Sequence, residues 1–129
     1  MEYIADTSFI THHFKIPKVR ILIPESVFEE IRYPSERLKI ALWEVEIINP
    51  KKRFVKKVMN EAKKIGYLER LSKADIDVLA LALERKGVIL TNDFAIQNVA
   101  RRLKIKFEGD IKIKKYKKRR KKLEERLKE

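Results

Sequence analysis

The sequence predicts an α/β protein with a parallel β-sheet between helices. Short apolar segments alternate along the chain with longer segments of helical periodicity. Most of the short segments are continuous apolar runs, which are typical of strands covered on both faces of a parallel sheet. The chain has 129 residues, enough for one domain with a hydrophobic core, and 44% of them are hydrophobic.

The first part of the chain contains three predicted strands and three predicted helices. Thr7 or Ser8 can cap the first helix. Pro24 suits the first turn of the second helix, which Pro34 would end, and Ser35 is the candidate cap of the third. The strands are predicted over residues 2–6, 18–23 and 45–50, and the helices over 7–14, 25–32 and 35–43.

The second part continues the alternation. A helix with a basic outer face is predicted before Gly66, a residue suited to a helix C-terminus. The next helix is almost wholly apolar and ends before Gly87, and a third opens at Asn92-Asp93. These helices are predicted over residues 51–65, 72–86 and from 92 onward, and strands over 88–91 and 105–107.

The charge changes abruptly near the C-terminus. We predict one domain over residues 1–110, followed by a basic segment, 111–129, that is helical or flexible. The net charge of the chain is +13, and about +8 of it comes from the eleven Lys/Arg and three Glu of the basic segment. Clustered positive charge favours a polyanionic partner, nucleic acid first. The candidate RNA-binding residues are Lys115, Lys117, Lys118, Arg119, Arg120, Lys121 and Lys122.

The composition limits the kinds of functional site and the cellular location that we expect. The absence of cysteine excludes disulfides, thiol nucleophiles and cysteine-based zinc sites. No apolar run approaches membrane-spanning length, so we expect no membrane partner. The N-terminal residues lack the pattern of a signal peptide, and we expect a cytoplasmic protein.

Two aspartates follow predicted strands. Asp6 follows the first strand and Asp93 the fourth, and sites in such sheets gather beyond the carboxyl ends of the strands. Asp93 can alternatively stabilise the start of its own helix. A capping role is harder to propose for Asp6, because we expect no helix to begin before Thr7.

Two further acids are chosen by helical phase, at 100° per residue. Asp75 falls on the buried face of its helix, whereas Asp77 falls about 200° away, which predicts a surface acid. Glu30 lies nearer the apolar side of its helix than Glu29. Asp75 has an alternative role, because Ser72 and Asp75 have the spacing of a capping box.

Acids from separate elements suit a metal site. Mg²⁺ and Mn²⁺ prefer oxygen ligands, and such ions can activate water and stabilise the leaving oxygen in phosphodiester cleavage. Without a metal, clustered carboxylates would repel one another and their pKa values would rise. The spacing alone leaves both the metal site and the capping roles open.

Four segments carry a resemblance to a known family: Ile4-Ala-Asp-Thr-Ser8, Ile23-Pro-Glu-Ser-Val-Phe-Glu-Glu-Ile31, Leu71-Ser-Lys-Ala-Asp-Ile-Asp-Val-Leu-Ala-Leu-Ala82 and Val88-Ile-Leu-Thr-Asn-Asp93. Together they resemble the PIN-domain nucleases, in that family's order and across roughly residues 1–107. The stretches 66–84 and 91–100 look like one branch, the Nob-type endonucleases that mature the 3′ end of small-subunit ribosomal RNA.

The resemblance implies a five-stranded parallel sheet and a metal-dependent endoribonuclease that cleaves single-stranded RNA and leaves a 5′-phosphate. It also makes a homodimer plausible. It implies Mg²⁺ or Mn²⁺ held by Asp6, Asp75 and Asp93. Carried over by position, the catalytic acids are Asp6, Glu30, Asp75 and Asp93, with Ser8, Thr91 and Asn92 beside them to bond and orient them.

The sequence departs from the Nob-type pattern at two points. Asn92 stands where that pattern usually has a second aspartate, and no cysteine-based zinc ribbon follows the domain. Two alternatives therefore stay open. One is a PIN-fold RNA-binding or ribosome-assembly factor with little or no catalysis, and the other is the toxin of a toxin–antitoxin pair.

Overall fold

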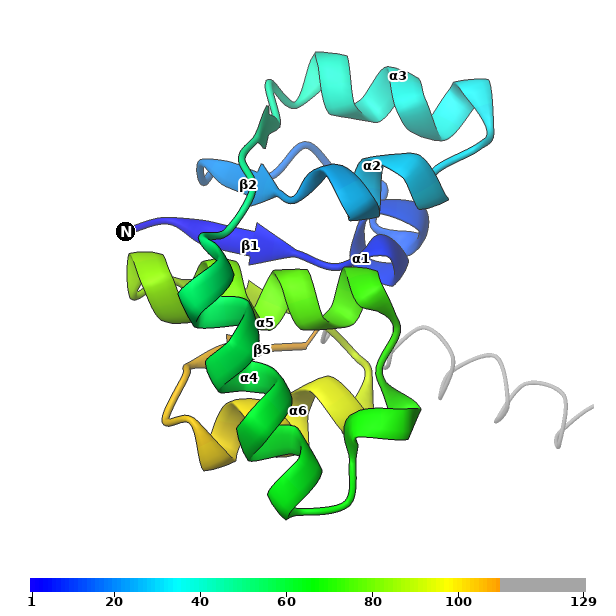
Figure 1. Ribbon diagram of the computed structural model, residues 1–129. Helices are drawn as coiled ribbons and strands as arrows, with labels where there is room; N and C mark the ends of the chain where they lie inside the picture. Colours follow the sequence, from blue (N-terminus) through cyan, green and yellow to red (C-terminus); the bar gives the residue numbers. More distant parts are fainter. Residues whose placement is uncertain (110–129) are drawn as a thin grey trace, which may run out of the picture.

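The computed structural model describes residues 1–109, in which strands and helices alternate (Figure 1). The predicted basic segment, with its candidate RNA-binding lysines and arginines, lies outside the described residues. The elements in chain order are β1 (Tyr3–Ala5), α1 (Thr7–His12), β2 (Ile21–Ile23), α2 (Glu25–Glu30), α3 (Pro34–Leu42), β3 (Glu46–Ile47), α4 (Lys52–Lys64), the 3₁₀ turn η1 (Leu68–Arg70), α5 (Lys73–Arg85), β4 (Val88–Leu90), α6 (Phe94–Arg102) and β5 (Phe107–Glu108).

The five strands form one parallel sheet in the order β3-β2-β1-β4-β5, which confirms the predicted fold class. The central strand β1 pairs with β2 through Ile4 and Leu22, and with β4 through Ile4 and Ile89. All three side chains are fully buried. Because every strand runs the same way, the carboxyl ends of β1 and β4 meet at one edge of the sheet, on the right in Figure 1.

Helix α5 is the hub of the helical packing. It contacts β1 and β4 of the sheet and the helices α2, α4 and α6. Its residues from Val78 to Leu81 are all fully buried, as the apolar run predicts. The turn that follows needs glycine, because a Cβ on Gly87 would lie 2.5 Å from the Ile4 side chain and 2.8 Å from the Glu2 carbonyl oxygen.

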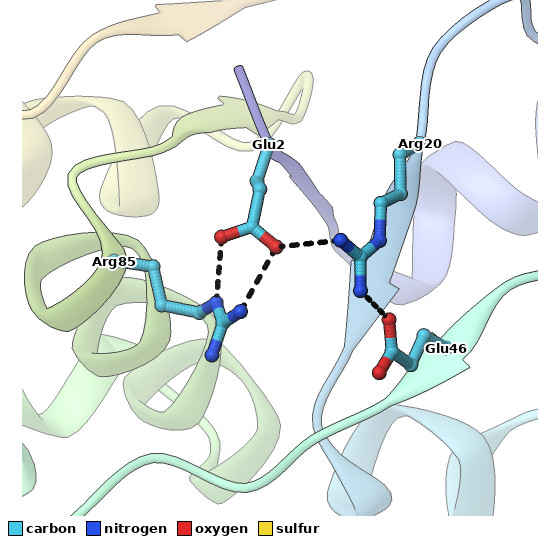
Figure 2. A network of polar contacts seen from close by, with 4 residues as sticks. All are labelled: Glu2, Arg20, Glu46 and Arg85. Carbon is cyan, nitrogen blue, oxygen red and sulfur yellow. Dashed lines mark hydrogen bonds and ion pairs between the residues drawn. The ribbon is translucent and has the colours of Figure 1, made fainter.

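A polar network joins elements at the amino ends of the strands (Figure 2). Arg85, at the end of α5, donates to both carboxylate oxygens of Glu2 at 2.8 and 3.0 Å. Arg20 lies between Glu2 and Glu46 and forms ion pairs with both. The bond from Arg85 lowers the pKa of Glu2. The network therefore fixes the starts of the strands, at the edge opposite their carboxyl ends.

Several predicted boundaries are wrong in detail. The second and third strands are shorter than predicted, and β5 begins at Phe107 rather than at Ile105. Helix α3 begins one residue early, because Pro34 occupies its first position and Tyr33 is the cap. Pro24 precedes α2 as its cap residue instead of lying inside it. No helix in residues 1–109 is long and apolar enough to cross a membrane.

Candidate active site

Asp6 is the most buried acid at the carboxyl edge of the sheet, with 4% of its surface exposed. Its Oδ1 accepts bonds from the Phe9 amide at 2.8 Å and the Ser8 hydroxyl at 3.0 Å, and its Oδ2 accepts from the Thr91 hydroxyl. The bond to Phe9 makes Asp6 the cap of α1. The expectation that Asp6 has no helix to cap is therefore wrong, because α1 begins directly at Thr7.

Among the described residues, no base balances the charge on Asp6. Burial raises the pKa of its carboxyl; the bonds from Thr91, Phe9 and Ser8 oppose that effect, and the charge of Asp93 adds to it. The net shift is upward. Within residues 1–109, no lysine, arginine or histidine forms an ion pair with Asp6. Asp6 is thus a buried carboxylate held by neutral donors beside a second acid.

Asp93 caps α6 and shares a hydroxyl with Asp6. The exposed Asp93 carboxylate accepts from the amides of Ala95 and Ile96 at 2.8 and 3.2 Å, so its capping alternative is correct. Its own N–H donates to Thr91 Oγ1 at 3.0 Å. Thr91, which is fully buried, therefore joins Asp93 to Asp6 through one oxygen atom.

Asp75 has the capping role that the sequence left open, and it also lies near the other aspartates. It forms the capping box with Ser72: the Ser72 amide donates to Asp75 Oδ2 at 2.9 Å, and the Asp75 amide donates to Ser72 Oγ at 3.1 Å. Burial raises the pKa of Asp75, and the charges of Asp93 and Asp6 raise it further against the opposing bonds from Ser72. The Asp75 carboxylate thus lies within electrostatic range of both other aspartates.

Asp77 is not the surface acid that helical phase predicts. It is partly buried and accepts a 2.6 Å hydrogen bond from the Ser26 hydroxyl of α2. Helical phase still separates the two acids, because Asp77 bonds to α2 whereas the charges of Asp6 and Asp93 act on Asp75. The prediction failed because α2 packs against that side of α5.

Glu30 stands apart from the three aspartates. It is the exposed last residue of α2 and accepts a 2.6 Å hydrogen bond from the Thr7 hydroxyl. Thr7 directly follows Asp6, so the Thr7 side chain links Glu30 to the carboxyl edge of the sheet. The role of Thr7 was missed, although its place next to Asp6 was a usable signal.

Gln97 was also missed. Its side-chain amide donates to the Thr91 carbonyl oxygen at 3.1 Å, and only 7% of its surface is exposed. It therefore fixes the backbone of the residue that joins Asp6 and Asp93. The available signal was a lone polar residue on the apolar face of its helix, four positions after Asp93. Asn92 is partly buried and lies between Thr91 and Asp93 in the chain.

The three aspartates suit a hard cation by their chemistry. Among the described residues, no group of three or more acidic or histidine side chains is arranged so that it could hold a metal ion by itself. Mg²⁺ keeps several waters, however, and is commonly held by one or two carboxylates. Within residues 1–109 these carboxylates lack basic partners, and the charge of Asp93 raises the pKa values of Asp6 and Asp75, so a cation between them would stabilise their charges. The chemistry of the donor set therefore suits a divalent cation.

Comparison with known proteins identifies the family. A family model described as the PIN domain of ribonuclease matches residues 3–84. The chain is 40% identical over 94 residues to Endoribonuclease Nob1 of Pyrococcus abyssi, covering 73% of this chain and 56% of that protein. It is 36% identical over 110 residues to Ribonuclease VapC1 of Thermoplasma acidophilum, covering 83% and 57%. The chain thus spans just over half the length of these curated relatives.

A solved structure supports the fold. The crystal structure of VapBC2 from Rickettsia felis bound to a promoter DNA fragment includes a chain that matches with a TM-score of 0.62 and 15% sequence identity. The match covers 84% of this chain and 98% of that chain. At this identity it is evidence for the fold alone. The family match, the archaeal relatives and the sheet topology together show that the chain belongs to the PIN domain family.

Proposed function

We propose that this protein is a metal-dependent endoribonuclease that cleaves single-stranded RNA. The observation that carries the proposal is the Thr91 hydroxyl, which joins Asp6 and Asp93 at the carboxyl edge of the sheet. Asp75 adds its charge to the same place. Acids brought together from three elements, without a basic partner in residues 1–109, favour a cation-binding role over a purely structural one.

Each residue has a definite task in this proposal. Asp6, Asp75 and Asp93 would hold a Mg²⁺ or Mn²⁺ ion, which when bound activates water for attack on phosphorus and stabilises the leaving oxygen. The donors to Asp6 fix the orientation of its carboxylate. Glu30, held by Thr7, would orient the attacking water or help to hold the ion.

The distribution of positive charge supports an RNA substrate. The Thr91 amide donates to the Glu108 carbonyl oxygen at 3.0 Å, so the chain leaves β5 next to the candidate active site. The basic stretch, with its candidate RNA-binding residues, follows directly in the sequence. Contacts from such residues to phosphates add affinity that depends on salt but not on base sequence.

The curated relatives favour two biological roles. Similarity to Endoribonuclease Nob1 agrees with the Nob-type resemblance of the sequence, which implies processing of the 3′ end of small-subunit ribosomal RNA. Similarity to Ribonuclease VapC1 supports the second candidate, a toxin ribonuclease of a toxin–antitoxin pair. The two roles share the cleavage chemistry and differ in target and partner. Growth arrest on expression, with a small protein that co-purifies, would favour the toxin.

A cleavage assay tests the proposal. Purified protein is incubated with single-stranded RNA and Mn²⁺, alongside Asp6→Asn protein whose fold is verified by circular dichroism. Loss of a group that only orients a metal ligand typically costs 10–100-fold, so loss of a ligand should reduce cleavage by about 100-fold or more. Equal cleavage by both proteins would refute the catalytic assignment. RNA binding without cleavage, unaffected by Mn²⁺ or Mg²⁺, would support a non-catalytic RNA-binding factor instead.

A further inference from the structure

A pocket of about 380 Å³ lies between α2, the loop before α4, and the first turns of α4 and α5. It has the volume of a small-ligand site. Its lining is strongly charged and includes residues of both signs. The residues used below are Glu29, Asn49, Lys52, Lys56, Lys73 and Asp77.

The pocket adjoins the candidate active site without sharing its acids. Lys73 and Asp77 lie two residues before and after Asp75, a separation of about 3 Å each way along the helix axis. The charges of Asp93 and Asp6 act on Asp75, whereas Asp77 accepts a hydrogen bond from Ser26 of α2. A strand of RNA at the aspartates therefore has this pocket within reach of a neighbouring nucleotide.

One side of the pocket offers unused positive charge. Lys52 and Lys56 are one turn apart on α4, and Lys73 faces them from the start of α5. All three are exposed, and none forms an ion pair with another described residue, although acids line the same pocket. Their ammonium groups are therefore available to an anionic ligand.

The other side offers hydrogen-bond acceptors. The Ser26 hydroxyl holds Asp77 Oδ2, and Asn49 holds the start of α2 by accepting from the Glu25 amide at 2.9 Å. Glu29 is exposed and has no hydrogen bond or ion pair within residues 1–109. A ligand that uses both sides must carry an anion and hydrogen-bond donors within one small unit.

We infer that this pocket binds one ribonucleotide of the RNA strand, next to the phosphodiester that is cleaved. Lys52, Lys56 and Lys73 bind phosphate, and Glu29 accepts a hydrogen bond from the ribose 2′-hydroxyl, the group by which proteins distinguish RNA from DNA. The inference rests on the proposed function, because it takes single-stranded RNA as the substrate. It adds the location of a subsite and a reason for RNA selectivity.

Metal-free binding tests the lysines. The full chain is titrated into a short fluorescent single-stranded RNA in EDTA, and affinity is measured by anisotropy. Lys52→Gln/Lys56→Gln removes two charges that line the pocket, whereas Lys57→Gln/Lys63→Gln removes two exposed charges from the same helix outside it. We expect about tenfold weaker binding for the first pair and less than about threefold for the second. Equal weakening would overturn the inference.

A comparison of RNA affinity with DNA affinity tests the role of Glu29 separately. If this carboxylate only repels phosphates, Glu29→Gln will strengthen the binding of RNA and of DNA of the same sequence equally. If it accepts the 2′-hydroxyl, the DNA affinity rises and the RNA-to-DNA affinity ratio falls about fivefold. Glu69→Gln, the same change at an exposed residue outside the pocket, should leave the ratio unchanged. An unchanged ratio in Glu29→Gln would overturn the role of Glu29.

These measurements are independent of cleavage. Because EDTA removes divalent ions, a protein that binds RNA through the pocket but never cuts it would contradict the proposed function and leave the subsite intact. A protein that cuts RNA but shows no difference between the two lysine pairs would contradict the subsite alone.

Discussion

Replacing Thr91 with valine tests how the candidate site is held together. The substitution keeps the β-branched shape of a residue that is fully buried at the end of β4. It removes the hydroxyl that donates to Asp6 Oδ2 and accepts from the Asp93 amide. The Asp6 carboxylate then keeps only its bonds from Ser8 and Phe9.

The expected cost follows from the groups that lose partners. A hydrogen bond to a charged group contributes about 1.5–3 kcal/mol. Water cannot replace the lost bond to Asp6, because Asp6 is almost fully buried. The amide of Asp93 loses its acceptor as well, at about 1 kcal/mol. We therefore expect Thr91→Val to lower the free energy of unfolding by about 2.5–4 kcal/mol, a large part of the 5–15 kcal/mol of a typical domain.

Thr7→Val is the matched control. It is the same chemical change at the same edge, but the bond from Thr7 to Glu30 is exposed to solvent. Water can replace that bond, so the expected cost is below about 1 kcal/mol. Urea denaturation without divalent metal measures both variants. Equal costs, or a cost below about 1 kcal/mol for Thr91→Val, would refute the claim that Thr91 holds the buried carboxylate.

Three further predictions concern other parts of the molecule. Glu2→Gln should lower stability at neutral pH and leave RNA cleavage unchanged; because the folded pKa of Glu2 is lowered, its difference from wild type in urea denaturation should vanish as pH falls from 4.5 through that folded pKa. Asp75→Asn should abolish metal-dependent cleavage, whereas Asp77→Asn should keep kcat at saturating RNA; similar kcat values would contradict the geometry of α5. Phe94, 75% exposed beside Asp93, should stack on a base, so Phe94→Ala should raise KM for single-stranded RNA about tenfold, whereas Phe14→Ala, at an 82% exposed residue, should not.

Much of the fold could be predicted because its signals are local. The apolar runs around Ile4, Leu22 and Ile89 marked buried parallel strands, and the alternation with helices set the fold class. The rule for the carboxyl ends of parallel strands then placed Asp6 and Asp93 at one edge. Helical phase separated Asp75 from Asp77 because it depends only on sequence spacing.

The parts that failed depend on contacts between distant residues. The burial of Asp77 comes from Ser26, which is 51 positions away in the chain, and Glu30 is held by Thr7 across 23 positions. Spacing along one element carries no information on such partners. The bonds from Ser8 and Thr91 to Asp6, the second of them across 85 positions, were expected only from the family resemblance.

The central claim is that Asp6, Asp75 and Asp93 bind a divalent cation together. Titration calorimetry with Mn²⁺ at neutral pH measures this most directly, on wild type, on each of the three Asp→Asn variants and on Glu69→Gln as a control. We predict that wild type and Glu69→Gln bind Mn²⁺ with equal affinity, and that each aspartate variant binds at least about tenfold more weakly. Wild-type protein that binds no Mn²⁺, or an Asp6→Asn variant that binds it equally well, would contradict the account.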